Sequence, residues 1–450
     1  MRLRTIDNFL DVDQRNFALS VIEDRAIPSV IDGFKPVQRK IVYIANKIWK
    51  DGSGKPMKVF QLGGQVSSLA MYAHGDASMN GAITSMGQTF KNNLPLLDGV
   101  GQYGSLRVPV AGAPRYIGVK LSKNFGLVYK DFELLKGKVE EGYEVEPDFF
   151  LPIVPMVILN GSSGIAVGYA TNILNRNPLD VVNACLDHLK GRKVKELKPW
   201  LAEFSGRYER DSENPNRWNV YGVYEVVNST TVKVRDIPPS VTFEKYEEYL
   251  DGLLDRKAIA DYENNSSSGV DYTVKFTRSE LKKLVDDGKL EALLKVNGSE
   301  TENITTLDEN GHLKIFARAE DIVPYFCDYR LGWYARRKEY LVGKLERELC
   351  VLDNKARFVK AIIDKKLKVG NVPKKEVTDW LEKNGFDKSN GGYDYLVGMP
   401  IHSLTREKFE ELLKAKESKK SELEAMRKRE PKDMYVDDLN GLKKALSKKQ

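Results

Sequence analysis

Cysteine and histidine are both scarce in this sequence, and neither shows a spacing typical of a metal site. The 450 residues include three cysteines and four histidines, with no CxxC or HExxH pattern among them. An odd number of dispersed cysteines also argues against a framework of disulfide bonds. The cysteines are Cys185, Cys327 and Cys350, and the histidines are His74, His188, His312 and His402. We therefore expect that this chain holds no metal ion by itself.

Signals for nucleotide binding and for membranes are missing too. A phosphate-binding loop of the form GxxxxGK[ST] is absent, because residues 54–56 read Gly-Lys-Pro and residues 137–139 read Gly-Lys-Val. No apolar run approaches the ~18 residues that a membrane-spanning helix needs. Charged residues within positions 1–7 interrupt what would be the apolar stretch of a signal peptide. The sequence therefore predicts a cytoplasmic protein that has no membrane contact and does not bind ATP through such a loop.

Length and charge set the broad class of the protein. A chain of 450 residues exceeds the roughly 250–300 residues at which a single core stops growing, so two or three domains are expected. Lys and Arg number 71 against 64 Asp and Glu, a net charge of +7 that permits a polyanionic partner without requiring one. With 41% hydrophobic and 30% charged residues, the chain is typical of a folded, soluble protein.

The first third of the chain combines a clear helical pattern with segments rich in small polar residues. Apolar side chains recur at helical spacing over residues 37–48, directly after Pro36, a residue favoured in the first turn of a helix. Residues 63–104 are dense in Gly, Ser, Asn and Asp, and the sequence at 94–99 is typical of a turn. These patterns predict a helix at 37–48 and functional loops over 63–104.

The middle of the chain, from about residue 150 to 326, has the patterns of a mixed α/β structure. Residues 221–227 and 231–234 are predicted strands, and apolar residues at helical spacing predict a helix over 243–253. An Asn-Gly pair at 310–311 stands between two short apolar segments and predicts a β-hairpin.

The last third of the chain is predominantly helical. From residue 327 apolar side chains step by three, four or seven, and no proline interrupts them before Pro373. A second helical run at 409–426 follows a compact insertion at 385–400, so the two helices could return antiparallel as a coiled-coil arm. The charged tail from Arg427 onward is expected to fray.

Three stretches of sequence carry a specific resemblance. Residues 25–39 read RAIPSVIDGFKPVQR, residues 73–116 begin with AHGD and end with PRY, and residues 160–168 read NGSSGIAVG. In this order and at these spacings they resemble the DNA-cleaving subunit of type IIA DNA topoisomerases, the family that contains the DNA gyrase A subunit. The resemblance covers nearly the whole chain, and it is strongest to the medium subunits of the T-even bacteriophage enzymes.

The resemblance implies an α+β multidomain fold. Residues 1–149 would form a winged-helix DNA-cleavage domain, and residues 150–326 a mixed α/β tower domain. Residues 327–450 would form a long antiparallel coiled coil that carries a small helical C-gate, used for dimerisation, near residues 367–402.

The resemblance also implies that Tyr116 is a nucleophile and that Arg115 assists it. A tyrosine oxygen that attacks a phosphodiester keeps the bond energy in a phosphotyrosine, so a deoxyribose hydroxyl can later reverse the step. The fixed charge of Arg115 would stabilise the negative charge that develops on the phosphoryl oxygens. In this family the tyrosine becomes linked to a 5′ phosphate. Considered alone, Tyr116 is one of 21 tyrosines and could simply pack.

His74 matches the second histidine of the family's paired-histidine motif. Tyr72 and Ala73 stand where the first histidine and the proline of that motif would be. We expect His74 to contact the scissile phosphate or to assist proton transfer, the alternative being a histidine that only caps a loop. Residues 112–114 and 117–118 depart from the bacterial pattern around the tyrosine.

Four further positions match DNA-contacting residues of the family. Arg25, Lys35 and Arg39 are expected to line the cleavage site and to clamp phosphates, although such residues can also form a solvated face. Ile165 matches the residue that wedges between base pairs, partly unstacks them and bends the DNA. The alternative for Ile165 is ordinary core packing.

The expected partners follow from the same resemblance. They are double-stranded DNA, a second copy of the chain, and a separate subunit that binds ATP and holds most of the Mg²⁺. A homodimer also suits the chemistry, because cutting both strands requires two tyrosines related by a two-fold axis. A different kind of function remains open, namely a winged-helix architectural protein that bends DNA but has lost catalysis.

Overall fold

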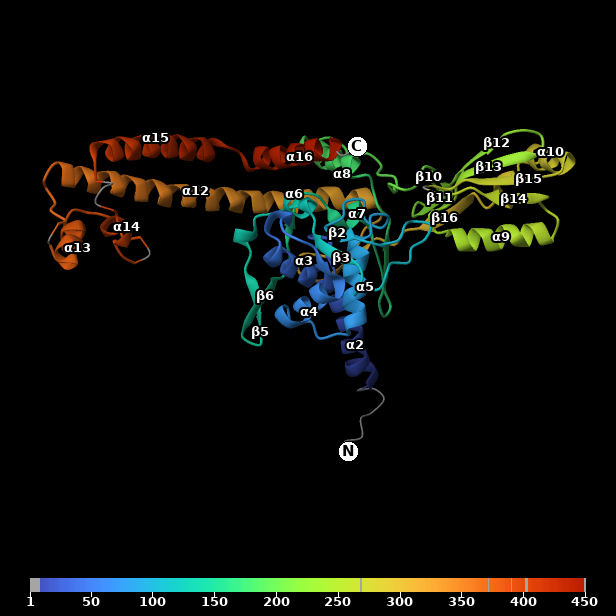
Figure 1. Cartoon of the computed structure of the whole chain (residues 1–450), viewed down its shortest axis with the longest axis horizontal. Coiled ribbons are helices and arrows are strands. Elements are labelled where there is room, and N and C mark those ends of the chain that lie inside the picture. The colour runs from blue at the N-terminus through green and yellow to red at the C-terminus, as the bar shows by residue number, and fades with distance from the viewer. Residues whose placement is uncertain (1–8, 268, 371, 390, 401–403, 449–450) are drawn as a thin grey trace, which may run out of the picture. The chain divides into compact units, whose positions relative to one another are not determined.

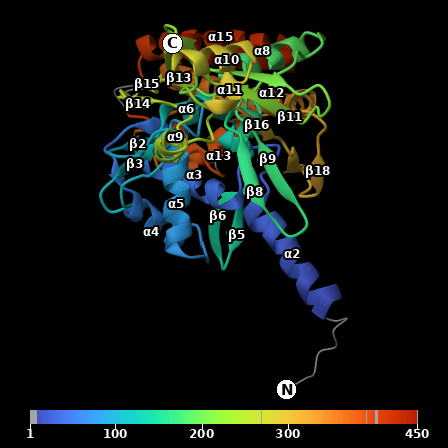
Figure 2. The same cartoon turned by 90° about the vertical axis from the view of Figure 1, so that its right-hand side faces the viewer.

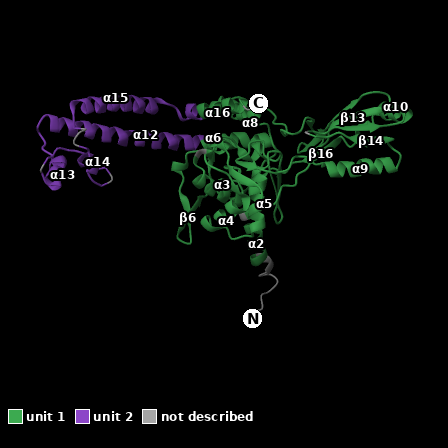
Figure 3. Ribbon diagram, viewed as in Figure 1, with its two compact units in different colours: residues 1–330, 436–450 green, residues 331–435 purple. Residues whose placement is uncertain are grey.

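The structure is a computed structural model that describes residues 9–448, except for residues 268, 371, 390 and 401–403. The expected C-gate segment at 367–402 therefore falls partly outside the described residues, and His402 falls wholly outside them. The chain divides into two compact units, one of residues 1–330 and 436–450 and one of residues 331–435 (Figure 3). Both units are described below, each by itself.

The first unit begins with helices that surround a small sheet, as in a winged-helix fold. β1, β3 and β2 form a three-stranded antiparallel sheet in that order. The predicted helix after Pro36 is confirmed as α3, whose Ile41, Val42, Ile44 and Ala45 are buried. The elements are η1 (Phe9–Gln14), α2 (Arg15–Val21), η2 (Ile22–Ala26), α3 (Pro36–Ile48), η3 (Lys50–Gly52), β1 (Met57–Lys58), α4 (Val59–Leu69), α5 (Asp76–Gly87), β2 (Leu97–Val100) and β3 (Gly118–Leu121).

The prediction of loops over residues 63–104 is wrong, because α4, α5 and β2 occupy much of that segment. The buried apolar side chains of the two helices recur at helical spacing. They are Val59, Leu62 and Val66 in α4, and Met79, Ile83 and Met86 in α5. Small and polar residues between these positions hide the pattern in the sequence. Packing of the apolar face overrides their low helix propensity.

The next segment contains two hairpins, β5–β6 and β8–β9, and three of the four aromatic residues of a buried cluster. Phe34, Phe125, Tyr129 and Phe150 pack with ring centroids 4.9 to 6.3 Å apart. The β8–β9 hairpin projects as a narrow antiparallel ribbon (Figure 2), with Ile165 opposite Ala170. The elements are α6 (Lys123–Val128), β4 (Tyr129–Lys130), η4 (Phe132–Leu134), β5 (Gly137–Glu140), β6 (Tyr143–Pro147), β7 (Leu151–Pro152), α7 (Met156–Leu159), β8 (Ser162–Ile165), β9 (Ala170–Ile173) and α8 (Pro178–Leu189).

Two antiparallel sheets follow, in the order β10-β11-β16 and β12-β13-β15-β14. The predicted strands and the predicted helix of this region are confirmed as β12, β13 and α9 (Figure 1). The hairpin at 310–311 is also confirmed, since Gly311 has a φ of +80° between β17 and β18. The elements are β10 (Arg207–Arg210), β11 (Arg217–Tyr221), β12 (Val223–Val226), β13 (Thr231–Asp236), α9 (Phe243–Asp255), β14 (Asp261–Asn264), β15 (Tyr272–Lys275), α10 (Arg278–Asp286), α11 (Leu290–Leu293), β16 (Asn297–Thr301), β17 (Thr305–Leu307) and β18 (Leu313–Ile315).

The second unit contains two long helices that run antiparallel, as the sequence predicted. Three ion pairs join them, and the residue number rises along one helix as it falls along the other. They are Asp353 with Lys416 at 2.6 Å, Glu348 with Lys419 at 3.1 Å and Glu346 with Arg427 at 2.6 Å. The elements of this third of the chain are η5 (Ala319–Asp321), α12 (Ile322–Ile363), α13 (Lys374–Lys383), α14 (Asp394–Val397), α15 (Arg406–Lys428) and α16 (Pro431–Ser447).

The prediction of a frayed tail after Arg427 is wrong, because α16 forms there. Tyr435 is fully buried and stacks on Tyr334 with ring centroids 4.5 Å apart. Leu439 and Leu442 are buried one and two turns further along. The apolar face of α16 outweighs the charged residues between these positions. The domain boundaries near residues 150 and 327 stay a prediction.

Candidate functional site

The segment at residues 101–117, called the 101–117 loop below, joins β2 to β3 and carries the predicted nucleophile. Tyr116 is 72% exposed, which argues against a packing role for its side chain. Its backbone is fixed, since its amide donates to the carbonyl of Ala113 at 2.8 Å and its carbonyl accepts from the Lys58 ammonium at 2.8 Å. The loop therefore presents the phenol to solvent on an anchored backbone.

Arg115 lies at the edge of a groove between α5 and the 101–117 loop. The groove has a volume of about 920 Å³, and its lining includes Asp76, Asn80, Lys91 and Phe60. Arg115 is exposed and, within the described part of the chain, makes no ion pair. Its guanidinium is thus available to an anion that approaches Tyr116.

His74 and Arg25 are 49 residues apart in sequence but in contact in the structure. The Arg25 Nη2 lies 3.1 Å from His74 Nδ1. Because a guanidinium can only donate, Nδ1 must be the acceptor, so a neutral His74 carries its proton on Nε2. The Tyr72 ring packs edge-on against the imidazole at 5.2 Å. The residue that departs from the family motif thus supports the histidine by contact.

Lys35 stands at the start of α3 and reaches the base of the β8–β9 hairpin. Its ammonium donates to the Ser163 carbonyl at 2.6 Å, and burial lowers its pKa. A Cβ atom on Gly164 would lie 2.2 Å from the Ala26 carbonyl, so the hairpin lies directly against the segment that follows Arg25. An ammonium has three donors, which leaves donors on Lys35 for a further acceptor.

The predicted phosphate contact of Arg39 is not supported by the structure. Its side chain is 9% exposed and makes a bidentate ion pair with the fully buried Asp32, at 2.7 and 3.2 Å. Burial alone lowers the pKa of Arg39, but the charge of Asp32, helped by Glu146 and Asp148, outweighs it and raises that pKa. Arg39 therefore belongs to the buried core, because its partner Asp32 lies beneath the surface.

Ile165 is 86% exposed, at the end of β8, so the core-packing alternative is wrong. The hairpin beneath it is tied to the rest of the first unit from both strands. Lys35 holds β8, and Asn172 of β9 exchanges backbone hydrogen bonds with Asn303 at 2.8 and 2.9 Å. An exposed apolar side chain on a braced hairpin suits insertion into a partner.

Only some of the predicted site residues contact one another in the structure. Arg25 pairs with His74, and Lys35 joins the hairpin of Ile165, but no hydrogen bond or ion pair among the described residues links either group to Tyr116. Sequence reasoning missed Lys58 and Lys91. Lys91 lines the groove of Arg115 and also a second hollow of about 620 Å³ that contains Lys35, and burial lowers its pKa. No pattern in the sequence around Lys58 or Lys91 predicts a functional role for either lysine.

Mg²⁺ does not fit the described residues of this chain as a self-contained site. They include no group of three or more His, Cys, Asp or Glu side chains that could hold a metal ion. In the groove beside Arg115, Asp76 is the carboxylate among the lining residues. A hard cation such as Mg²⁺ requires more oxygen ligands than that.

No helix in the described ranges is both long enough and apolar enough to cross a membrane.

Comparison with known proteins identifies the family of the chain. The family model that describes the A-type subunits of DNA gyrase and topoisomerase IV matches residues 25–440. The chain belongs to this family. The match includes every predicted site residue.

Individual relatives agree with this assignment. The DNA topoisomerase medium subunit of Enterobacteria phage T4 is 32% identical over 444 residues, which cover 98% of this chain and 99% of that protein. DNA topoisomerase 2 of Plasmodium falciparum is 31% identical over 469 residues, which cover 94% of this chain. The chain spans about a third of the length of that protein and of the other topoisomerase 2 relatives.

A solved structure also matches nearly the whole chain. The DNA-binding, cleavage and re-ligation domain of Plasmodium falciparum topoisomerase II aligns with a TM-score of 0.85 and 32% sequence identity. The alignment covers 95% of this chain and 62% of the other. The predicted α+β multidomain fold is thereby confirmed.

Proposed function

We propose that this chain is the DNA-cleaving and religating subunit of a type II DNA topoisomerase, with Tyr116 as its nucleophile. The observation that carries the proposal is the exposed Tyr116 beside an exposed Arg115, on an anchored loop of a chain that matches the phage T4 medium subunit over 99% of that protein. A DNA-bending protein without catalysis would have no use for this pair.

In the proposed reaction, the Tyr116 oxygen attacks a backbone phosphorus and the deoxyribose 3′ oxygen leaves. The phenol proton is lost, the leaving oxygen gains one, and a 5′-phosphotyrosyl bond replaces the phosphodiester. The reverse attack by the 3′ hydroxyl reseals the strand, so the chemistry itself consumes no nucleotide. Arg115 would stabilise the charge that develops on the phosphoryl oxygens. His74, aligned by Arg25, would contact the phosphate or move a proton at Nε2.

DNA binding is proposed to use Arg25, Lys35 and the wedge Ile165. The first two would neutralise phosphates, and such contacts make affinity salt-dependent but largely independent of sequence. Insertion of Ile165 would cost a few kcal/mol of unstacking, which is recovered when the bent duplex touches more of the protein. The hydrogen bond from Lys35 to Ser163 would place a phosphate contact and the wedge in fixed relation.

The remaining parts of the enzyme are proposed to come from partners. Cutting both strands requires a second copy of the chain, hence a homodimer. A separate subunit would bind ATP and hold most of the Mg²⁺, as the sequence lacks a phosphate-binding loop of its own. We further propose that the protein works in the cytoplasm, where its DNA substrate and its partner subunit would be found.

The decisive test is covalent trapping. End-labelled duplex DNA is mixed with the chain, its partner subunit and magnesium, then denatured with detergent and digested with protease. The wild-type chain should leave a peptide on the 5′ ends, and Tyr116→Phe should leave none while it retains DNA affinity. The matched control is Tyr143→Phe, which removes a hydroxyl from another exposed tyrosine outside the 101–117 loop. Adducts from Tyr116→Phe, or none from the wild type, would refute the proposal.

A further inference from the structure

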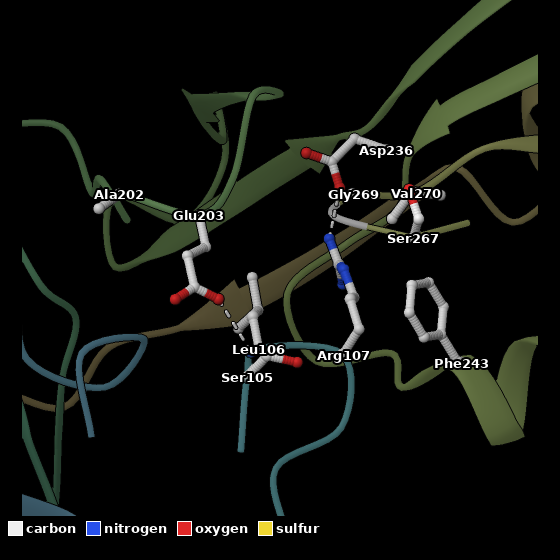
Figure 4. A pocket seen from close by; sticks show the side chains of 10 residues that line it. All are labelled: Ser105, Leu106, Arg107, Ala202, Glu203, Asp236, Phe243, Ser267, Gly269 and Val270. Atoms are coloured by element: carbon white, nitrogen blue, oxygen red, sulfur yellow. Dashed lines mark hydrogen bonds and ion pairs between the residues drawn. The ribbon is translucent and has the colours of Figure 1, made fainter. Parts of the chain in front are cut away.

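Arg107 lies nine residues before Tyr116 in the 101–117 loop, but its side chain is buried at the junction with β13 and α9 (Figure 4). The guanidinium side chain is 7% exposed and donates to four acceptors in one short segment. The acceptors are the Asp236 carboxylate at 2.5 Å and the carbonyls of Ile237, Pro238 and Val241 at 2.5, 2.8 and 2.9 Å.

Neighbouring backbone groups strengthen this junction, which we call the Arg107 clasp (residues 106–107, Glu203 and 236–243). The Leu106 amide donates to Glu203 at 3.0 Å, and the Phe243 amide donates to the Arg107 carbonyl at 3.1 Å. The second oxygen of Asp236 accepts from the amide and hydroxyl of Ser205 at 2.7 and 2.8 Å. The carboxylate is thus fully engaged, and each partner fixes the position of the next.

The clasp and Lys58 hold the loop at two separate places. Lys58 fixes the carbonyl of Tyr116, at the end of the loop. Between the two attachments much of the chain is exposed, with Val110 at 72%, but the Gln88 side chain and the Phe60 amide donate to the Pro109 and Pro114 carbonyls at 3.4 and 3.3 Å. These contacts hold the loop to α4 and to the residue after α5, whereas the clasp holds it to a different sheet. A buried, charged anchor there restricts movement of the loop away from that sheet, and displacement of a reacting group by about 1 Å can cost about 10²-fold in rate.

We propose that Arg107 is a positioning residue for strand cleavage, which sets the place of Tyr116 by locking its loop to the segment at 236–243. This inference rests on the proposed function. It makes the placement of the nucleophile depend jointly on the β1-β3-β2 sheet and on the β12-β13-β15-β14 sheet. Arg107 itself would touch neither DNA nor the reacting atoms.

The experiment compares Arg107→Met and Arg107→Lys with the wild type in single-turnover cleavage with the partner subunit and magnesium. Rates are measured at saturating DNA and expressed per folded molecule. Arg107→Met should lower the cleavage rate by about 10- to 100-fold, while the Kd for DNA stays within about threefold. Arg107→Lys should recover part of the rate, because an ammonium keeps the charge and can reach some of the four acceptors.

A milder variant and a control separate positioning from general loss of stability. Glu203→Ala removes the contact to the Leu106 amide from an exposed side chain and should lower the rate by a few fold, whereas Glu203→Gln keeps an acceptor and should not. The control is Tyr246→Phe, which removes a buried hydrogen bond from the Tyr246 hydroxyl of α9 to the Leu294 carbonyl. It should lower the melting temperature but leave cleavage per folded molecule unchanged.

The outcomes are distinct. If Arg107→Met fails to fold, the Glu203 pair and Arg107→Lys decide the matter. The inference is overturned if Arg107→Met, or both Arg107→Lys and Glu203→Ala, cleave DNA at the wild-type rate per folded molecule. It is also overturned if Tyr246→Phe loses as much of the cleavage rate as Arg107→Met does. Absence of any adduct from the wild type overturns the proposed function instead.

Discussion

Replacing Arg39 with methionine tests whether this residue stabilises the core or clamps DNA. Methionine preserves much of the aliphatic volume and removes the guanidinium. Asp32 would keep hydrogen bonds from the amides of Phe34 and Phe150, at 3.0 and 3.1 Å, but would lose both contacts to its cationic partner. Breaking a buried ion pair at one partner costs about 3–5 kcal/mol, because an uncompensated charge stays buried. We therefore expect Arg39→Met to lower the local free energy of unfolding by about 3–5 kcal/mol.

Two further variants test the size of this loss in the free energy of unfolding. Arg39→Lys keeps the charge but loses the bidentate geometry, so a loss of about 1–3 kcal/mol is expected. Adding Asp32→Asn to Arg39→Met removes the orphaned charge and should recover about 1–2 kcal/mol. Recovery is incomplete because one amide oxygen replaces a carboxylate that serves two backbone donors.

Native-state hydrogen exchange is the appropriate assay, because a chain of several modules has no single unfolding free energy. Exchange is followed in peptides that cover residues 30–41 and 147–154, and DNA affinity is measured against salt in parallel. We expect faster exchange in both peptides and an unchanged salt slope in the fraction that remains folded. A loss below about 1 kcal/mol, combined with a slope reduced by about 0.9, would show that Arg39 is a phosphate clamp after all.

The other expected outcomes concern the site and α16. Arg115→Ala keeps the nucleophile, so covalent adducts should still form in the trapping assay, about 10²–10³-fold more slowly. Lys35→Met should reduce the slope of log affinity against log salt by about 0.9, and titrations at several salt concentrations that give an unchanged slope would contradict a phosphate contact. Ile165→Gly should keep much of the affinity but reduce DNA curvature in a fluorescence-transfer assay, and wild-type curvature would rule out the wedge. Tyr435→Ala should destabilise its surroundings by about 3–5 kcal/mol, measured by native-state hydrogen exchange in peptides that cover α16, whereas a frayed tail would give no change.

Some local features could be predicted because their causes are local. Proline in a first turn followed by apolar residues at helical spacing was enough for α3, and an Asn-Gly pair was enough for the β17–β18 hairpin. The same reasoning failed for α4 and α5, where glycine and serine between the buried positions suggested loops. Their helical structure depends on what packs against Val66 and Ile83, which local propensity does not describe.

For the site, the sequence by itself determined the family and the order of the motifs, because a run of motifs at fixed spacing is specific without any coordinates. It therefore identified Tyr116, Arg115 and Ile165 as candidates, and the structure leaves all three exposed, the tyrosine at 72% and the isoleucine at 86%. What only the tertiary structure decided was the environment of each charged residue. Lys35 and Arg39 lie in one short motif and have the same charge, and the sequence treats them alike.

Lys35 and Arg39 differ in the partners that the fold brings to them. The carbonyl of Ser163 lies 128 residues from Lys35 in sequence and leaves that ammonium further donors, whereas the Asp32 carboxylate beneath the surface takes both contacts of Arg39. The Arg107 clasp, whose partner Asp236 is 129 residues away, could not be predicted for the same reason. Burial of a charge depends on a partner brought close by the fold, and no spacing within a motif reveals that partner.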